Sequence, residues 1–312
     1  MALSEITLAE AFCNGTPLGD ASSGAPEYGP PLTNQQVFQL ALAHADSALT
    51  LANGTDATST AIRNAAAVTK ARAQLALGQF TSVAATVANV PTNFQNLATF
   101  ALTSGDNQIW SLNTNQKRWV VGDSFDVGGR IANAIPFASA GDPRIKVTGN
   151  STASSPAGKS FDGSTSFVAQ TNFGRVESTP IVSGLDARLY EAEARLQAND
   201  FTGMMTILNG LRAAPPNLGT FTPAAMAALP APADRNGAID TYFREKAFWV
   251  FGRGQRQGDL RRLVRQYGRT QANVFPSGQF FKGGQYGADV NFPVTVDEQN
   301  NPAFTGCIDR NP

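Results

Sequence analysis

The sequence predicts a mainly α-helical protein in which tetratricopeptide-like helical hairpins carry a loop-rich insertion with short β-strands. Three observations support this fold class: apolar residues recur at helical spacing in both terminal regions, a helix–turn–helix pattern occurs twice, and the middle is rich in Gly, Asn, Ser and Asp. They divide the chain into an N-terminal loop with helical hairpins (residues 1–104), the insertion (105–180) and a C-terminal helical region with an irregular tail (181–312).

The N-terminal region is expected to place three helices after a loop over residues 15–33, which is rich in Gly, Pro and Ser. Thr33 and Asn34 are residue types that cap helix N-termini, and apolar residues follow them at helical spacing to about residue 53. A second helix is expected from 59 to 77, where Gly78 ends it, and a third from 80 to the residue before Pro91.

A similar pattern of residues occurs at 71–83 and again at 192–204. Each copy reads as a helix rich in small residues, a turn, and an aromatic residue that enters a second helix. Small residues let two helices approach closely while the aromatic ring fills the elbow, as in tetratricopeptide-type hairpins. The pattern therefore predicts two hairpins of this kind.

The insertion and the C-terminal region differ in pattern. Short strands are expected in the insertion at 109–112, 118–121, 145–147 and 166–169. Helices are expected at 183–197, at 201–213 and from 239 through to 267, with a Pro/Ala-rich loop over 214–234 and an irregular chain after 271.

Composition excludes some functional classes. Lys plus Arg and Asp plus Glu each number 24, so the net charge is zero and a nucleic-acid-binding role is not expected. Charged residues make up only 15% of the chain, against about 25% in an average domain. Two interpretations remain open: an extracellular protein rich in uncharged polar residues, or a subunit that packs against copies of itself.

The sequence offers little for catalysis or metal binding. His44 is its single histidine, and none of the common serine-hydrolase, zinc-protease or nucleotide-binding motifs occurs. Two carboxylates could still converge as in glycoside hydrolases, although nothing in the sequence marks such a pair. We therefore expect no enzyme activity, no cofactor and no metal site.

The two cysteines lie near opposite ends of the chain, at Cys13 and Cys307. Chain termini often lie close together in a compact domain, so we predict a Cys13–Cys307 disulfide, with two separate buried thiols as the alternative. Closing so long a loop would stabilise the fold by about 4–5 kcal/mol in the chain-entropy model. Such a bridge would place the protein in an oxidising compartment.

A recognition surface is expected in residues 107–119, where aromatic and amide side chains alternate. Sugars present apolar C–H faces ringed by hydroxyl groups, so they favour an exposed aromatic ring with hydrogen-bonding groups beside it. Trp110 and Trp119 are the candidate platforms, and either could instead be core packing, as we expect for Trp249. The candidate polar partners are Asn113, Asn115, Gln116 and Arg118.

The C-terminal third resembles the SusD/RagB family of bacterial surface proteins. The resemblance rests on residues 244–262 (REKAFWVFGRGQRQGDLRR), followed by 292–298 (FPVTVDE) and Asn301-Pro302. Weaker matches lie upstream at 189–195, at 142–144 and in the hairpin at 71–80, so the similarity covers most of the chain from about residue 35. Family members continue further at the N-terminus, with more helices, a signal peptide and a lipid-bearing cysteine.

Within the matching segment, charged residues alternate with apolar ones over a predicted helix pair. Bidentate arginine–carboxylate pairs would pin that pair to the rest of the domain, so these side chains are expected to be structural. They are Arg244, Glu245, Arg253, Asp259, Arg261 and Arg262.

The resemblance implies a non-catalytic protein on the outer-membrane surface of a Gram-negative-type bacterium. Such a protein captures an oligosaccharide or another nutrient for a TonB-dependent outer-membrane transporter. The alternative is a secreted structural subunit that assembles into a filament, tube or surface layer. For that alternative, homo-oligomer contacts are expected through the loop-rich middle and the tail 271–312.

Overall fold

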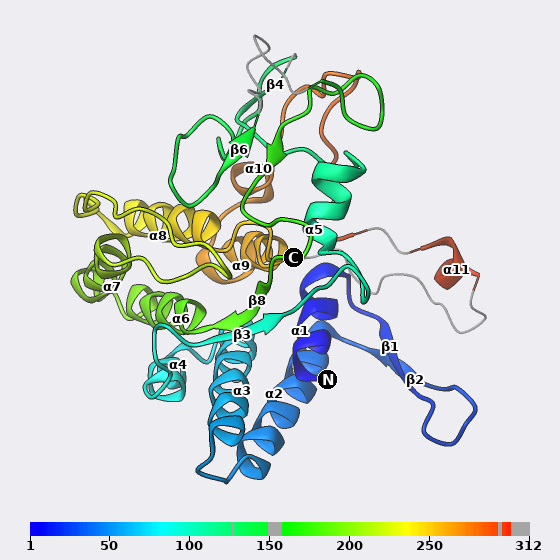
Figure 1. Cartoon of the computed structure of the whole chain (residues 1–312), viewed down its shortest axis with the longest axis vertical. Coiled ribbons are helices and arrows are strands. Elements are labelled where there is room, and N and C mark those ends of the chain that lie inside the picture. Colours follow the sequence, from blue (N-terminus) through cyan, green and yellow to red (C-terminus); the bar gives the residue numbers. More distant parts are fainter. Residues whose placement is uncertain (127, 149–157, 293–294, 301–312) are drawn as a thin grey trace. The chain divides into compact units, whose positions relative to one another are not determined.

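The computed structural model describes residues 1–126, 128–148, 158–292 and 295–300. The chain forms two compact units (Figure 1). Unit 1 contains Met1–Val90, Gln255–Gln271 and the segment from Ala288, and unit 2 contains Pro91–Gly254 and Ala272–Gly287. The division at residues 104 and 180 was drawn from changes in composition along the sequence. The two units are instead defined by packing, and each contains segments that are distant in the sequence.

Unit 1 is built on a layer of helices. Its helices are α1 (Ala2–Ala11), α2 (Asn34–Leu51), α3 (Ala57–Ala76), α4 (Phe80–Val87), α9 (Arg256–Tyr267) and α11 (Val296–Gln299). α1, α2 and α3 share a core of small and medium apolar side chains: Ile6, Ala9, Val37, Phe38, Ala41, Ala73 and Ala76. The alanines allow close approach of these helices.

Two helix boundaries of unit 1 confirm the signals expected at Thr33 and Gly78, and a third, at Asp56, was not identified from the sequence. Thr33 and Gln36 form a reciprocal capping box at the start of α2. The Asp56 carboxylate accepts a hydrogen bond from the Ser59 amide at 2.9 Å at the start of α3. After α3, Gly78 has a φ of 74°, a left-handed conformation that favours glycine.

The expected loop over residues 15–33 is instead a β-hairpin, so that prediction was wrong. β1 (Thr16–Asp20) pairs antiparallel with β2 (Glu27–Leu32), and Pro17 lies opposite Pro31. Prolines lack the N–H that a central strand needs, which made this segment read as a loop. They are compatible with a two-stranded ribbon because each strand has one free edge.

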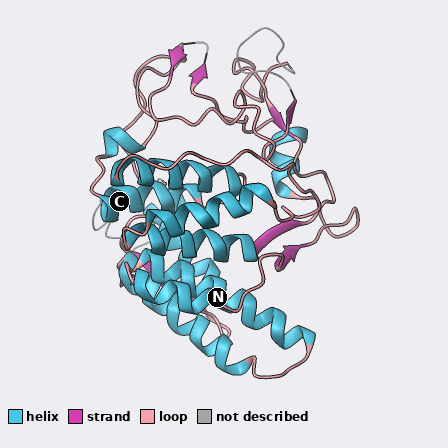
Figure 2. Ribbon diagram, turned by 90° about the vertical axis from the view of Figure 1, so that its left-hand side faces the viewer, coloured by secondary structure: helices cyan, strands magenta, loops and turns pink. Residues whose placement is uncertain are grey.

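Unit 2 contains the second hairpin and most of the short strands. Its long helices are α6 (Gly184–Gln197), α7 (Phe201–Ala213) and α8 (Arg235–Trp249). β3 (Gln95–Ala98) pairs antiparallel with β8 (Thr179–Ser183), which leads directly into α6. The α3–α4 and α6–α7 pairs confirm the two predicted helical hairpins, and the mainly helical, tetratricopeptide-like fold class is confirmed with them (Figure 2).

The structure corrects two expectations about helices and strands. The helix expected from 239 through to 267 is broken between α8 and α9, where Gly252 and Gly254 have φ values of 72° and 69°. The strand expected at 109–112 is helical, with α5 (Gln108–Trp110) continuing into a π-helical turn over Ser111–Asn115. Asn107 caps this helix by accepting a hydrogen bond from the Ile109 amide at 2.9 Å, a signal that the alternation of residue types hid.

The remaining strands of the insertion are short. They are β4 (Phe125–Asp126), β5 (Gly129–Arg130), β6 (Val147–Thr148) and β7 (Ala169–Gln170), and the short helix α10 spans Gln271–Val274. β6 and β7 overlap the ends of the expected strands at 145–147 and 166–169. Residues 118–121 form no strand: the Arg118 amide donates back to Leu112 in the π-helical turn, and the Val121 amide makes a single bond to Val168.

Buried ion pairs tie the segments of unit 2 together. The guanidinium of Arg144, 1% exposed, donates to Glu245 at 2.7 and 3.1 Å and to Asp142 at 2.6 and 2.8 Å. Arg212 also donates to Glu245, at 2.9 Å. Asp186 at the start of α6 receives two hydrogen bonds from Arg253, at 2.6 and 2.9 Å.

Unit 1 uses its arginines in a similar way. Arg261 is buried and donates to the carbonyl oxygens of Ala9, Glu10 and Phe12 at 2.9–3.0 Å, at the end of α1. Arg262 donates to Asp259 at 2.8 Å. The remaining member of the predicted set, Arg244 in unit 2, is exposed and lies over the Phe248 ring, 5.3 Å from its centroid.

Two further expectations concern the ends of the chain and the membrane. Cys13 is buried at 4% exposure. Cys307 lies outside the described residues, so the disulfide remains a prediction. Within the described ranges, no helix combines the length and the apolar character that crossing a bilayer requires.

We predict that Gly184→Ala destabilises the protein by about 1–3 kcal/mol, the usual cost of overpacking. A Cβ atom at Gly184 would lie 1.9 Å from the carbonyl oxygen of Pro91, and backbone cannot move aside as a flexible side chain can. Urea unfolding measures the change. Gly210→Ala is the matched control in α7, where a Cβ meets nothing within 4 Å, and it should stabilise by about 0.5–1 kcal/mol. Equal effects of the two variants would contradict the prediction.

We also predict that Glu245→Ala costs about 3–5 kcal/mol, because it removes one of the two carboxylates that pair with the buried Arg144 guanidinium and also the partner of Arg212. Glu191→Ala removes the partner of Arg188 from a half-exposed pair on α6, and should cost less than about 1 kcal/mol. Calorimetric unfolding of both variants tests the difference. A loss at position 245 no larger than at position 191 would show that the buried network contributes little.

Candidate functional site

The two tryptophans expected as sugar platforms are both half-buried in unit 2. Trp110 ends α5, and the guanidinium of Arg175 lies 5.6 Å from its ring centroid. The Trp119 ring packs against Phe251 at a centroid distance of 6.4 Å. Trp249, by contrast, is 1% exposed and belongs to the core, as expected.

Their expected polar partners divide into buried and exposed groups. Asn113 is fully buried, where it donates to the Trp119 carbonyl and accepts from the Gln170 amide, both at 2.8 Å. Gln116 is exposed and donates to the Ser111 hydroxyl at 3.0 Å. Asn115 and Arg118 are exposed. Asn113 therefore shapes the segment from within, while Arg118 offers its charge at the surface.

Arg118 does face an aromatic platform, but the ring belongs to Phe161. The guanidinium carbon lies 3.8 Å from the Phe161 ring centroid, and Phe161 is 65% exposed. Sequence reasoning missed this residue, which sits in a short turn of Gly, Lys, Ser, Asp and Thr. A large aromatic residue within a run of turn-forming residues is expected to be exposed, and this expectation could have identified Phe161 as a candidate binding residue.

The backbone around Phe161 is fixed by hydrogen bonds. Its amide donates to the Lys117 carbonyl at 2.9 Å, and Lys159 bridges to Ser166. The Asp162 carboxylate accepts hydrogen bonds from the Ser164 and Thr165 amides, both at 2.8 Å. The exposed ring is therefore held on a closed turn.

A second turn, from the tail, is joined to the first. Lys282 pairs with Asp162 at 2.6 Å. In this tail turn Phe280 packs against Phe281 and Tyr286 at centroid distances of 5.1 and 5.5 Å. The Lys282 hydrogen bond, followed by those of Thr165 and Ser164, holds the pKa of Asp162 well below its usual range.

A third turn completes this group. Gly128, in the β4–β5 hairpin, lies so close to the tail turn that a Cβ there would be 3.2 Å from the Phe281 Cα. Phe125 of the same hairpin is 50% exposed. We call residues 125–126, 128–130, 158–166 and 279–286, together with Arg118, the loop cluster; it lies beyond the long helices of unit 2 (Figure 1).

The loop cluster combines apolar rings with polar and charged groups. The exposed faces of Phe125 and Phe161 can contact the C–H face of a sugar ring. Arg118 lies against Phe161, and the Asp162–Lys282 pair can exchange hydrogen bonds with hydroxyl groups. This arrangement suits binding of a neutral or polar ligand at an open surface.

Other reactive groups lie elsewhere in the described parts of the chain. His44 Nδ1 lies 2.9 Å from the Glu5 carboxylate, in unit 1. Over residues 1–126, 128–148, 158–292 and 295–300, His, Cys, Asp and Glu nowhere gather into a group that could hold a metal ion.

We predict that Lys282→Met raises the pKa of Asp162, because it removes the largest cause of the lowered value. The pKa should stay below its ordinary range, since the Ser164 and Thr165 hydrogen bonds remain. NMR titration of the Asp162 carboxyl carbon measures the shift. Because the folded-state pKa is lowered, the stabilisation from this contact is present above the unfolded-state pKa and is lost as the pH falls. An unchanged titration curve would show that the two turns are not joined in solution.

Comparison with known proteins finds no matching family model and no matching curated protein. Solved structures do match. A SusD superfamily protein from Bacteroides vulgatus ATCC 8482 has a TM-score of 0.52 and 14% identity, over 84% of this chain and 65% of that protein. A SusD-like protein from Bacteroides fragilis NCTC 9343 has a TM-score of 0.54 and 14% identity, over 89% and 69% respectively.

A third structure, a SusD-like carbohydrate binding protein from Bacteroides vulgatus ATCC 8482, has a TM-score of 0.48 and 15% identity. That TM-score is too low to establish a shared fold. This chain covers 65% of the first structure and 60% of the third. At such low identity the likeness concerns the fold alone.

Proposed function

We propose that this chain, which has a SusD-like fold, is a non-catalytic protein that binds glycan at its loop cluster. The observation that carries the proposal is the exposed Phe161 ring, held on a closed turn beneath the guanidinium of Arg118. An apolar ring that large, kept in solvent by fixed backbone hydrogen bonds, gains from a ligand that covers it.

The chemistry of the neighbouring side chains supports a carbohydrate as this ligand. Binding sites for sugars need an apolar face together with donors and acceptors for hydroxyl groups. Arg118 and Lys282 supply donors and Asp162 supplies acceptors beside the aromatic rings. Trp110 and Trp119, each half-buried, remain candidates to extend the same surface.

Delivery to a TonB-dependent transporter on the outer-membrane surface is the second part of the proposal. It rests on the sequence resemblance to the SusD/RagB family and on the shared fold. Co-purification from detergent-solubilised membranes with a transporter of that class, identified by mass spectrometry, tests it. Separation of the two proteins under mild detergent conditions would contradict this part and leave the glycan site unaffected.

We predict that Phe161→Ala weakens oligosaccharide binding by about tenfold or more, in line with the loss of an exposed stacking aromatic. A panel of neutral and acidic oligosaccharides, followed by calorimetric titration of the best ligand, provides the measurement. Arg118→Ala should weaken binding less, because the ring remains. Neither variant should lower the melting temperature appreciably, because both side chains are exposed.

Tyr28→Ala is the matched control, since Tyr28 is a 71% exposed aromatic residue on the β1–β2 hairpin of unit 1. Its binding should equal that of the unaltered protein. If Trp110→Ala and Trp119→Ala abolish binding while Phe161→Ala does not, the ligand lies on the tryptophans instead. If no oligosaccharide in the panel binds, the glycan proposal fails.

A self-assembling structural subunit remains the second candidate, and the β1–β2 hairpin favours it. Every residue of these strands is exposed or half-buried, and isolated two-stranded ribbons are only marginally stable in water. Its open edges are also able to pair with another chain. Sedimentation at high micromolar concentration, with and without deletion of residues 18–28, separates this candidate from a monomeric binding protein.

A further inference from the structure

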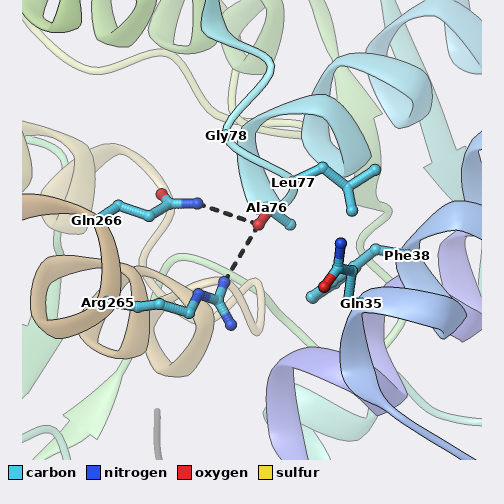
Figure 3. Close-up of a pocket in the computed structure, with 7 residues that line it drawn as sticks. All are labelled: Gln35, Phe38, Ala76, Leu77, Gly78, Arg265 and Gln266. Carbon is cyan, nitrogen blue, oxygen red and sulfur yellow. Dashed lines mark hydrogen bonds between the residues drawn. The ribbon is translucent and has the colours of Figure 1, made fainter.

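A pocket of about 300 Å³ lies in unit 1, between the C-terminal end of α3, the start of α2 and the last turn of α9 (Figure 3). Its walls combine apolar side chains, among them Phe38 and Leu77, with the amides of Gln35 and Gln266 and the guanidinium of Arg265. This volume is at the lower end for ligand sites, so it suits a small molecule or one end of a larger one.

The carbonyl groups at the end of α3 are already satisfied. Gln266 donates to the carbonyl oxygen of Leu75 at 2.9 Å. Gln266 and Arg265 both donate to that of Ala76, at 3.0 and 3.3 Å (Figure 3). These contacts hold Gln266 at the pocket wall by two hydrogen bonds and Arg265 by one. They use only part of the donor capacity of the Arg265 guanidinium, which has five N–H groups.

Arg265 carries a charge without a counterion. Among the described residues, no carboxylate lies within ion-pair distance of its guanidinium. The nearby arginines differ in this respect, since Arg262 contacts Asp259 and Arg72 contacts Glu10. A fixed guanidinium with unused donors, facing an open pocket, is an anion site, and its planar fork matches a carboxylate in particular.

The electrostatic surroundings favour an anion at this position. Arg265 is exposed to solvent. Partial desolvation of its guanidinium by the surrounding helices, followed by the charges of Arg261 and Arg262, lowers the pKa of Arg265 to about 10, and Glu10 offsets only part of this. The side chain therefore remains charged at neutral pH, in a field that is positive before any ligand arrives. A carboxylate in the pocket would relieve the repulsion between these guanidiniums.

The other residues that line the pocket indicate which kind of molecule should carry that carboxylate. The Arg265 guanidinium lies 5.9 Å from the Phe38 ring centroid, so an apolar surface adjoins the charge. Gln35 lines the other side with an exposed amide able to donate and accept. A ring with C–H groups and hydroxyls meets both needs, whereas a purely aliphatic acid would leave the amide unused.

We propose that this pocket binds a carboxylate on a body the size of one sugar ring. A free sugar acid and the uronate end of an oligosaccharide share this chemistry. The site is separate from the loop cluster and does not depend on the ligand proposed there.

Calorimetric or NMR titration with galacturonate, glucuronate and galactose tests the proposal on the full chain. The two acids should bind and galactose should not, because only the acids carry a negative carboxylate that can pair with the Arg265 guanidinium. Digalacturonate distinguishes the sources: binding tighter than galacturonate indicates an oligosaccharide end, and weaker binding indicates a free acid. Acetate binding as well as the sugar acids would overturn the proposal, because charge alone would then suffice.

Two variants locate the site. Arg265→Gln should weaken binding of the sugar acids by about tenfold or more, as expected for loss of a charge-assisted hydrogen bond. Arg195→Gln is the matched control, since Arg195 is an exposed arginine paired with Asp200 in unit 2, and it should leave binding unchanged. Equal affinity in the Arg265 variant would overturn the proposal.

Gln35→Glu provides a second test, which still applies if the Arg265→Gln variant does not fold. Residue 35 lies in the first turn of α2, where a carboxylate is favourable, so this variant should fold at least as well as the original. The new carboxylate would compete with the ligand for the Arg265 guanidinium and would repel a ligand carboxylate. A stably folded Gln35→Glu protein that still binds galacturonate with undiminished affinity would also overturn the proposal.

Discussion

The structure depends on the rule that a buried charge must be paired. Arg144 is almost completely buried, and its guanidinium contacts Asp142 two residues away and Glu245 about a hundred residues further along the chain. Removing such a cation from water is costly unless carboxylates surround it. The pairing therefore fixes the loop-rich insertion onto α8 in a single position, and with it the turns that form the loop cluster.

The same rule explains the low proportion of charged residues. A chain with 15% charged residues has few to spare, yet many of them are inside: Arg253 with Asp186, Lys246 with Glu193, and Arg72 with Glu10. Backbone carbonyls also receive buried guanidiniums, as Arg261 shows at the end of α1. These buried ion pairs join segments that are distant in the sequence, and fewer charged side chains remain for the exposed surface.

Local signals allowed much of the helical architecture to be predicted. Thr33 and Gly78 act within a few residues of their own positions, so their effect is visible in the sequence. The β1–β2 hairpin and the break at Gly252 were missed because other features masked them: prolines that usually exclude strands, and apolar residues that continue on both sides of the glycine. The helical turn at Ser111 was missed because it depends on a cap from Asn107.

The candidate site could be predicted only in part, because its members come together from separate turns. Arg118 was identified beside a tryptophan, whereas its aromatic partner, Phe161, lies 43 positions further along the chain. The partnership requires Asp162 to close its own turn and to meet Lys282 from the tail. None of these contacts leaves a periodic trace in the sequence. A rigid turn nevertheless costs a ligand little ordering entropy on binding, which is why an exposed ring so firmly held is a stronger functional signal than the two half-buried tryptophans.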